Sequence, residues 1–133
     1  VKKEAMEENL LFTGWRTDVK NIISDLDVLV FSTTTFPEGL PNTIIEAMAL
    51  GKSVVATDIP GPKDIVLNGV TGFLVPAGDV KAMAKKIIYL LDNRNIALEM
   101  GKQGRIRAKE LFDIRQSARQ IEKIYEEIIN ENN

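Results

Sequence analysis

The stretch that decides the fold is residues 26–57, LDVLVFSTTTFPEGLPNTIIEAMALGKSVVAT. Its first part, residues 26–32, contains an unbroken apolar run, which is typical of a strand buried on both faces of a sheet. A loop rich in turn residues follows, and then a helical pattern over residues 42–50 that Gly51 can terminate. Residues 53–57, SVVAT, predict a second strand within this stretch. Strand, helix and strand at this spacing indicate a βαβ unit and therefore a parallel sheet.

The same alternation continues on both sides of this unit. We expect strands at residues 10–13 and 72–75, a short helix that Thr17 or Asp18 can cap and that runs to about Asp25, and another helix at residues 62–68. After Asp79, a good N-cap residue, the pattern predicts helices at about residues 80–91, 96–111 and 114–129. Residues 1–133 are therefore predicted to form one α/β domain with helices flanking a parallel sheet.

The last of these helices carries an apolar stripe. Its apolar side chains recur at helical spacing, and they are Ile114, Ala118, Ile121, Ile124, Tyr125 and Ile128. We expect this stripe to pack on the chain's own sheet. The alternative interpretation is a surface for another domain.

The composition excludes several kinds of chemistry. The 133 residues include 17 basic and 19 acidic side chains but no cysteine and no histidine. Without an imidazole or a thiol there is no Ser-His-Asp or Cys-His nucleophile and no zinc site of the usual type. The net charge of −2 argues against a nucleic-acid partner, which normally requires a basic stripe. No signal peptide is evident and no apolar run approaches the ~20 residues of a membrane span, so we expect a soluble cytoplasmic domain.

The candidate site lies where the strand at residues 26–32 leads into the following helix. Ligands of open α/β sheets bind at the carboxyl ends of the strands. The first turn of a helix presents unpaired N–H groups and a partial positive charge, which suits a phosphate. Pro41 has no N–H, so Asn42 and Thr43 are the better donors, with Leu40 as a third candidate.

Two glutamates flank this phosphate seat, eight positions apart. Glu38 lies in the loop before the helix, and Glu46 lies about one turn inside it. Carboxylates accept charge-assisted hydrogen bonds from vicinal hydroxyls, so the pair suits a ligand with hydroxyl-rich groups on both sides of a phosphate. A nucleoside diphosphate sugar is such a ligand. The simpler alternative for Glu46 is a solvated position at the edge of a helix.

The literal sequence supports the ligand-binding alternative. Residues 38–61, EGLPNTIIEAMALGKSVVATDIPG, resemble the E-x7-E segment of the retaining glycosyltransferases of the GT-B fold, the glycosyl transferases group 1. Residues 9–16, 27–33 and 68–76 are similar to further segments of the same family. The resemblance implies a Rossmann-like parallel sheet with flanking helices, the C-terminal nucleotide-sugar-binding half of such an enzyme.

The resemblance also implies a role for each candidate residue. Glu38 would be the catalytic residue and would bind hydroxyls of the transferred sugar, while Glu46 would bind the ribose hydroxyls. The sugar and phosphates would be contacted by Gly39, Leu40, Pro41, Asn42 and Thr43. Main-chain groups around Trp15 and Arg16 would meet the base; for Trp15 the alternative is a partly buried turn residue.

The family uses a nucleoside diphosphate sugar as substrate, and the resemblance implies no cofactor and no metal. The D-x-D string Asp25-Leu26-Asp27 is a pattern of metal-dependent transferases. Here it precedes a predicted strand, at the end of the sheet away from the expected ligand cleft, so we interpret it as a helix-to-strand turn.

The strands predicted here correspond to the third to sixth strands of the family's domain, so its first two strands have no counterpart in this sequence. In the family's strand order they would lie between residues 10–13 and residues 26–32. Three outcomes are open: the chain is part of a longer polypeptide, which we predict, or residues 10–13 pair directly with residues 26–32, or a homodimer forms through the unpaired sheet edge. The family's N-terminal acceptor-binding domain is also missing, so we expect the chain alone to be inactive.

The sequence therefore predicts the donor-binding portion of a retaining, nucleotide-sugar-dependent glycosyltransferase that transfers a hexose to a polysaccharide or glycolipid. The alternatives are a non-catalytic nucleotide or sugar-phosphate binding module and a GT-B nucleotide-sugar epimerase. The expected location of the longer protein is the cytoplasm, including the inner face of the membrane.

Overall fold

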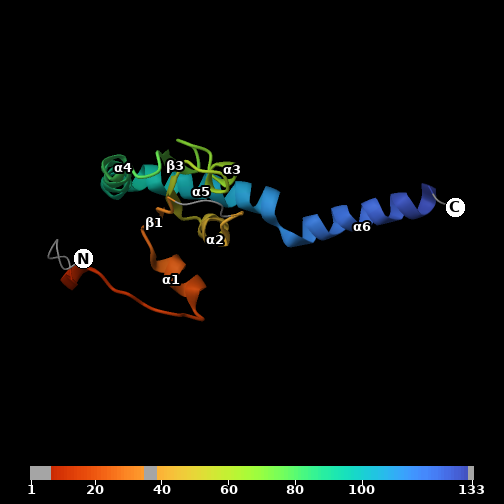
Figure 1. Ribbon diagram of the computed structural model, residues 1–133, viewed down its shortest axis with the longest axis horizontal. Helices are drawn as coiled ribbons and strands as arrows, with labels where there is room; N and C mark the ends of the chain where they lie inside the picture. Colours follow the sequence, from red (N-terminus) through yellow and green to blue (C-terminus); the bar gives the residue numbers. More distant parts are fainter. Residues whose placement is uncertain (1–6, 35–38, 132–133) are drawn as a thin grey trace.

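The computed structural model describes residues 7–34 and 39–131, and a small parallel sheet lies at its centre (Figure 1). The sheet has three strands in the order β1-β2-β3, with β1 at Val28–Phe31, β2 at Ser53–Thr57 and β3 at Gly72–Val75. Val55 of β2 pairs with Val30 on one side and with Phe73 on the other. The predicted βαβ unit and the parallel sheet are confirmed.

Helices cover both faces of this sheet. They are α1 (Val19–Asp25), α2 (Asn42–Ala49), α3 (Pro62–Ile65), α4 (Val80–Asp92), α5 (Arg94–Phe112) and α6 (Ile114–Glu131), and a 3-10 turn, η2, spans Glu7–Asn9. The three helices expected after Asp79 are confirmed. α3 is shorter than predicted, because the chain turns extended at Val66.

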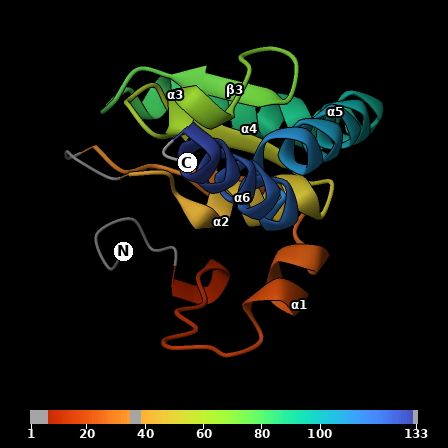
Figure 2. The same cartoon turned by 90° about the vertical axis from the view of Figure 1, so that its right-hand side faces the viewer.

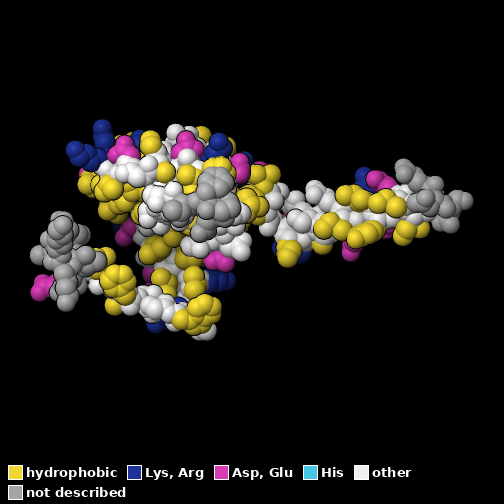
Figure 3. Space-filling model, viewed as in Figure 1, with side chains coloured by type: hydrophobic (Ala, Val, Ile, Leu, Met, Phe, Trp, Pro, Cys, Tyr) yellow, Lys and Arg dark blue, Asp and Glu magenta, His cyan; other side chains and the backbone are white. Residues whose placement is uncertain are grey.

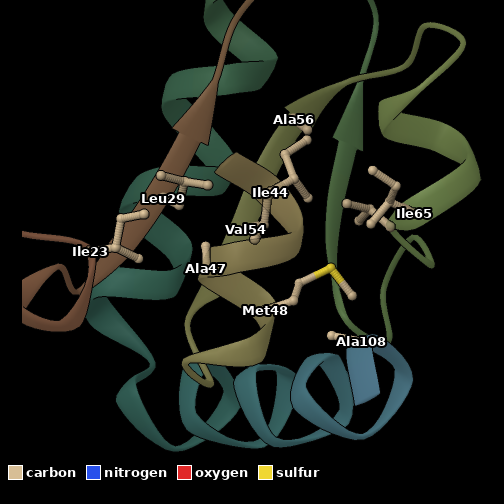
Figure 4. Close-up of a cluster of buried hydrophobic side chains, with 10 residues drawn as sticks. Ile23, Leu29, Ile44, Ala47, Met48, Val54, Ala56, Ile65 and Ala108 are labelled. Atoms are coloured by element: carbon tan, nitrogen blue, oxygen red, sulfur yellow. The ribbon is translucent and has the colours of Figure 1, made fainter. Parts of the chain in front are cut away.

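The core forms on both sides of β2, whose residues are all buried. Val54 and Ala56 belong to a cluster with side chains of α1, α2, α3 and α5, among them Ile44, Met48 and Ile65 (Figure 4). Val55 points to the opposite face and packs with Leu90 of α4 and Met100 of α5. This alternation explains why residues 54–56 are all apolar, since each face of the sheet is covered.

The strand predicted at residues 10–13 is wrong. This segment has no regular structure, and Leu11 and Phe12 are 85% and 81% exposed. In Figures 1 and 2 the chain from Glu7 to Arg16 runs apart from the sheet. A strand needs a neighbour for its N–H and C=O groups, and no strand of the described residues lies beside this segment. Direct pairing with β1 is therefore also wrong for this chain.

The expectation that α6 packs on the sheet is wrong as well. α6 extends away from the rest of the molecule, and hydrophobic side chains lie along it (Figures 1 and 3). All of its residues from Ile114 to Asn130 are exposed, with Ile114 at 80% and Tyr125 at 64%. The stripe of apolar residues marks a face that this chain itself leaves uncovered.

The start of α4 allows a test of a predicted cap. The Asp79 carboxylate accepts a hydrogen bond of 2.9 Å from the backbone N–H of Ala82. We expect Asp79→Ala to reduce the free energy of unfolding by about 1 kcal/mol, because the first turn of α4 loses the acceptor for one of its unpaired N–H groups. Urea denaturation followed by circular dichroism measures this change. Asp79→Asn is the control, since asparagine caps as well as aspartate, and an equal loss in both variants would contradict the capping role.

None of the helices in residues 7–34 and 39–131 combines the length and the apolar character that crossing a membrane requires.

Candidate functional site

The site begins at the carboxyl edge of the sheet, where α2 starts. Pro41 is the N-cap residue, and its carbonyl accepts hydrogen bonds from the N–H groups of Ile44 (3.0 Å) and Ile45 (3.4 Å). The exposed residues Asn42 and Thr43 form the first turn, and their backbone N–H groups donate to no acceptor within the described part of the chain. The helix thus presents two open donors at the edge where ligands bind in this class of sheet.

A hydrogen bond fixes this edge. The hydroxyl of Thr57, at the end of β2, donates to the carbonyl of Thr33 at 2.7 Å. Thr57 is buried, so this bond joins the segment that leaves β1 to the end of its neighbouring strand. The loop that enters α2 therefore starts from a fixed point.

Glu46 lies one turn beyond the open donors, on the exposed side of α2. It lines a cavity of about 300 Å³ between α1 and α2, together with Thr17, Val19, Lys20, Ala49 and Leu50. The fold thus brings Glu46 beside the segment that directly follows Trp15 and Arg16. The resemblance pointed to Glu46 and to Trp15 and Arg16 separately, and the structure places Glu46 beside the residues that follow Arg16.

Arg16 is already engaged within the chain. Its guanidinium donates to both carboxylate oxygens of Asp18, at 2.7 and 2.6 Å. This hydrogen bonding lowers the pKa of Asp18 and raises the pKa of Arg16. Asp18 stands at the N-cap position of α1 but makes no side-chain cap, because its carboxylate is held by Arg16. Asp18 is thus at the predicted cap position, but its side chain accepts from Arg16, a pair that was not predicted.

Trp15 is 95% exposed, so the alternative of a partly buried turn residue is wrong. Contact between the main chain of Trp15 or Arg16 and a base stays a prediction. Gly39 and Leu40 are exposed next to Pro41, as an approach to the helix start requires. Glu38 lies outside the described residues, so its predicted role is untested.

The D-x-D string lies where we expected it. Asp25 ends α1 and Asp27 directly precedes β1, so both are at the amino end of the sheet. In residues 7–34 and 39–131 no three Asp or Glu side chains are grouped in a way that could hold a metal ion.

A second cavity at the carboxyl edge was not predicted. It has a volume of about 280 Å³ and is lined by Ser32, Thr34, Thr57, Pro76, Gly78, Asp79, Val80 and Met83. Hydroxyl groups from the ends of β1 and β2 meet apolar side chains of the α4 turn there. Its residues come from three separate loops, so no single stretch of sequence signals it.

A parallel sheet with an open helix start at its carboxyl edge defines a Rossmann-like ligand-binding domain. The sequence places this domain in a family. Residues 1–93 match the family model of the glycosyl transferases group 1, and the chain belongs to that family. Its fold is that of the C-terminal half of GT-B glycosyltransferases.

Individual relatives agree with this assignment. The chain is 34% identical over 123 residues to the capsular polysaccharide biosynthesis glycosyltransferase CapM of Staphylococcus aureus, covering 92% of this chain and 32% of the relative. It is 33% identical to the lipopolysaccharide core biosynthesis mannosyltransferase LpsB of Rhizobium meliloti, covering 97% and 37%. Among solved structures, HepE of Anabaena in complex with UDP superposes with a TM-score of 0.90 at 26% identity, covering 95% and 34%.

The chain therefore spans about a third of the length of the curated relatives it matches. This share agrees with the expectation of a partial GT-B enzyme.

Proposed function

We propose that this chain is the donor-binding portion of a retaining glycosyltransferase that transfers a hexose from a nucleoside diphosphate sugar to a polysaccharide or glycolipid. The observation that carries the proposal is the arrangement along α2. The open N–H groups of Asn42 and Thr43 come first, and Glu46 follows one turn later in a cavity. A phosphate seat followed by a carboxylate for vicinal hydroxyls matches the diphosphate and ribose of such a donor.

The comparisons support the class of donor and of acceptor. Structures of HepE were determined with UDP and with UDP-glucose. CapM and LpsB are named for capsule and lipopolysaccharide synthesis. These relatives are transferases, which favours a transferase over an epimerase or a non-catalytic module. We extend the proposal to a cytoplasmic protein that works at the inner face of the membrane.

In the proposed mechanism, the backbone amides at the start of α2 stabilise the departing diphosphate together with basic side chains, without a metal or a cofactor. Glu38 binds the transferred sugar. The acceptor binds to an N-terminal domain that faces the carboxyl edge of this sheet. The exposed apolar stripe of α6 is a surface for that domain. This was the second of the two interpretations of the stripe. The alternative to this domain contact is a homodimer that forms through the unpaired edge of β1.

Glu46 gives the direct test of the proposed donor site. We expect Glu46→Gln to weaken binding of UDP or GDP to this chain about tenfold or more, because the ribose hydroxyls lose charge-assisted hydrogen bonds. Isothermal titration calorimetry with both nucleotides measures the dissociation constants.

The control is Glu122→Gln, which changes an exposed glutamate of α6 and should leave both dissociation constants unchanged. If Glu46→Gln and Glu122→Gln bind nucleotides equally well, the ribose role of Glu46 is wrong. Absence of nucleotide binding by the unaltered chain would count against the proposed function as a whole.

A further inference from the structure

The cavity between α1 and α2 contains one cation beside Glu46. Lys20, in the first turn of α1, lines this cavity with Thr17, while Val19, Ala49 and Leu50 supply apolar walls. A slot with apolar walls and a few polar groups suits a flat, partly polar ring. The cavity could therefore hold a base as well as the ribose hydroxyls.

The direction of α2 shows which part of a ligand would meet Lys20. Residues three or four positions apart on a helix are neighbours on one face, so Asn42 and Thr43, Glu46, and Ala49 and Leu50 follow one another along α2. If phosphates bind at the first pair and the ribose binds at Glu46, the base reaches the last pair. Lys20 lines the cavity with Glu46, Ala49 and Leu50, but not with Asn42 or Thr43. Its place is therefore at the base and not at the phosphates.

Lys20 is also the cation that remains free to act there. The guanidinium of the neighbouring Arg16 is held by Asp18 through two hydrogen bonds. The ammonium group of Lys20 forms no ion pair within residues 7–34 and 39–131. An unpaired ammonium group has three donors and no acceptor, so it prefers a carbonyl oxygen to an amino group.

We propose that Lys20 is a specificity-determining residue that selects donors with a keto base, uracil or guanine, over their amino counterparts, cytosine and adenine. This inference rests on the proposed function, because it takes the ribose to lie at Glu46. Uracil and guanine present a carbonyl oxygen where cytosine and adenine present an exocyclic amino group, which repels an ammonium group. The Lys20 ammonium group donates to that oxygen at the end of the slot away from the phosphate seat.

The experiment compares matched nucleotide pairs. UDP and CDP, and GDP and ADP, are titrated into the chain and into the variants Lys20→Met, Lys20→Arg and Lys85→Met. The fluorescence of Trp15 reports binding, because it is the single tryptophan of the chain and lies two residues before Thr17. Lys85→Met is the matched control on the exposed side of α4. Circular dichroism verifies that each variant keeps the helical content of the unaltered chain.

We expect the unaltered chain to bind the keto member of a pair about tenfold more tightly than the amino member. Lys20→Met should remove this preference by weakening the binding of the keto nucleotide alone. Lys20→Arg should keep the preference, because arginine also donates hydrogen bonds. Equal weakening of both members would overturn the inference, because it indicates general attraction to the diphosphate. An unchanged preference in Lys20→Met would overturn it too. The same titration of Glu46→Gln separates the two proposals, since its failure to weaken binding contradicts the ribose role of Glu46, and absence of binding by the unaltered chain contradicts the proposed function itself.

Discussion

Replacing Glu38 by alanine, in an active enzyme that contains this chain, is expected to lower turnover about a hundredfold or more. The resemblance assigns Glu38 to hydroxyls of the transferred sugar, on the side of the phosphate seat opposite Glu46. Charge-assisted hydrogen bonds contribute about 1.5 to 3 kcal/mol each, and each 1.36 kcal/mol of lost transition-state stabilisation lowers the rate tenfold. Loss of two such bonds therefore gives the expected effect.

Initial rates with saturating nucleotide sugar measure this change, and Glu110→Ala serves as the control because it removes an exposed carboxylate of α5. We expect the nucleotide itself to bind Glu38→Ala normally, since the proposed site has the ribose at Glu46 instead. Activity of Glu38→Ala within about twofold of the unaltered enzyme is a difference of only ~0.4 kcal/mol in the barrier. That result would exclude the assigned role, whatever the nucleotide affinity.

The sheet and most helices were predictable because local signals determine them. β2 is covered on both faces, so the centre of its sequence SVVAT, residues 54–56, is apolar without interruption. α4 begins after a residue that caps it, and Asp79 stands at that position in the sequence. For these elements the local pattern and the tertiary environment agree, which is the condition under which sequence patterns predict structure.

The wrong predictions for residues 10–13 and for α6 share a physical cause. Residues 10–13 have the apolar character of a strand, and α6 has the apolar stripe of a packed helix. Such patterns indicate that a segment needs a partner but do not identify it. Within the described residues neither segment has the partner that we expected, so one is extended chain and the other is an exposed helix.

The candidate site was predicted in part. The start of α2 and the position of Glu46 follow from the helix and from the family resemblance. The place of Lys20 beside Glu46, in contrast, depends on how α1 lies against α2. That packing joins residues more than 20 positions apart, and no local pattern encodes it.

The position of α2 itself depends on a close approach between the backbones of Gly51 and Gly101, which no sequence pattern predicts. A Cβ atom added to Gly101 of α5 would overlap the carbonyl oxygen of Gly51 and would lie 2.8 Å from its carbonyl carbon. Gly51 has a φ of 74° and ends α2, donating its N–H to the carbonyl of Met48 at 2.9 Å. Neither backbone can move freely, so only glycine fits at position 101.

We expect Gly101→Ala to lower the free energy of unfolding by about 3 kcal/mol, because the clash with backbone exceeds the gain of about 1 kcal/mol in helix propensity. Gly104→Ala is the matched control three residues along the same helix. There the added Cβ meets the flexible side chain of Met48 at 3.4 Å, so stability should change by less than about 1 kcal/mol. Urea denaturation compares the two variants. Equal stability of Gly101→Ala and Gly104→Ala would contradict the close approach of α5 to α2. A selective loss in Gly101→Ala should also weaken nucleotide binding, because α2 carries Asn42, Thr43 and Glu46.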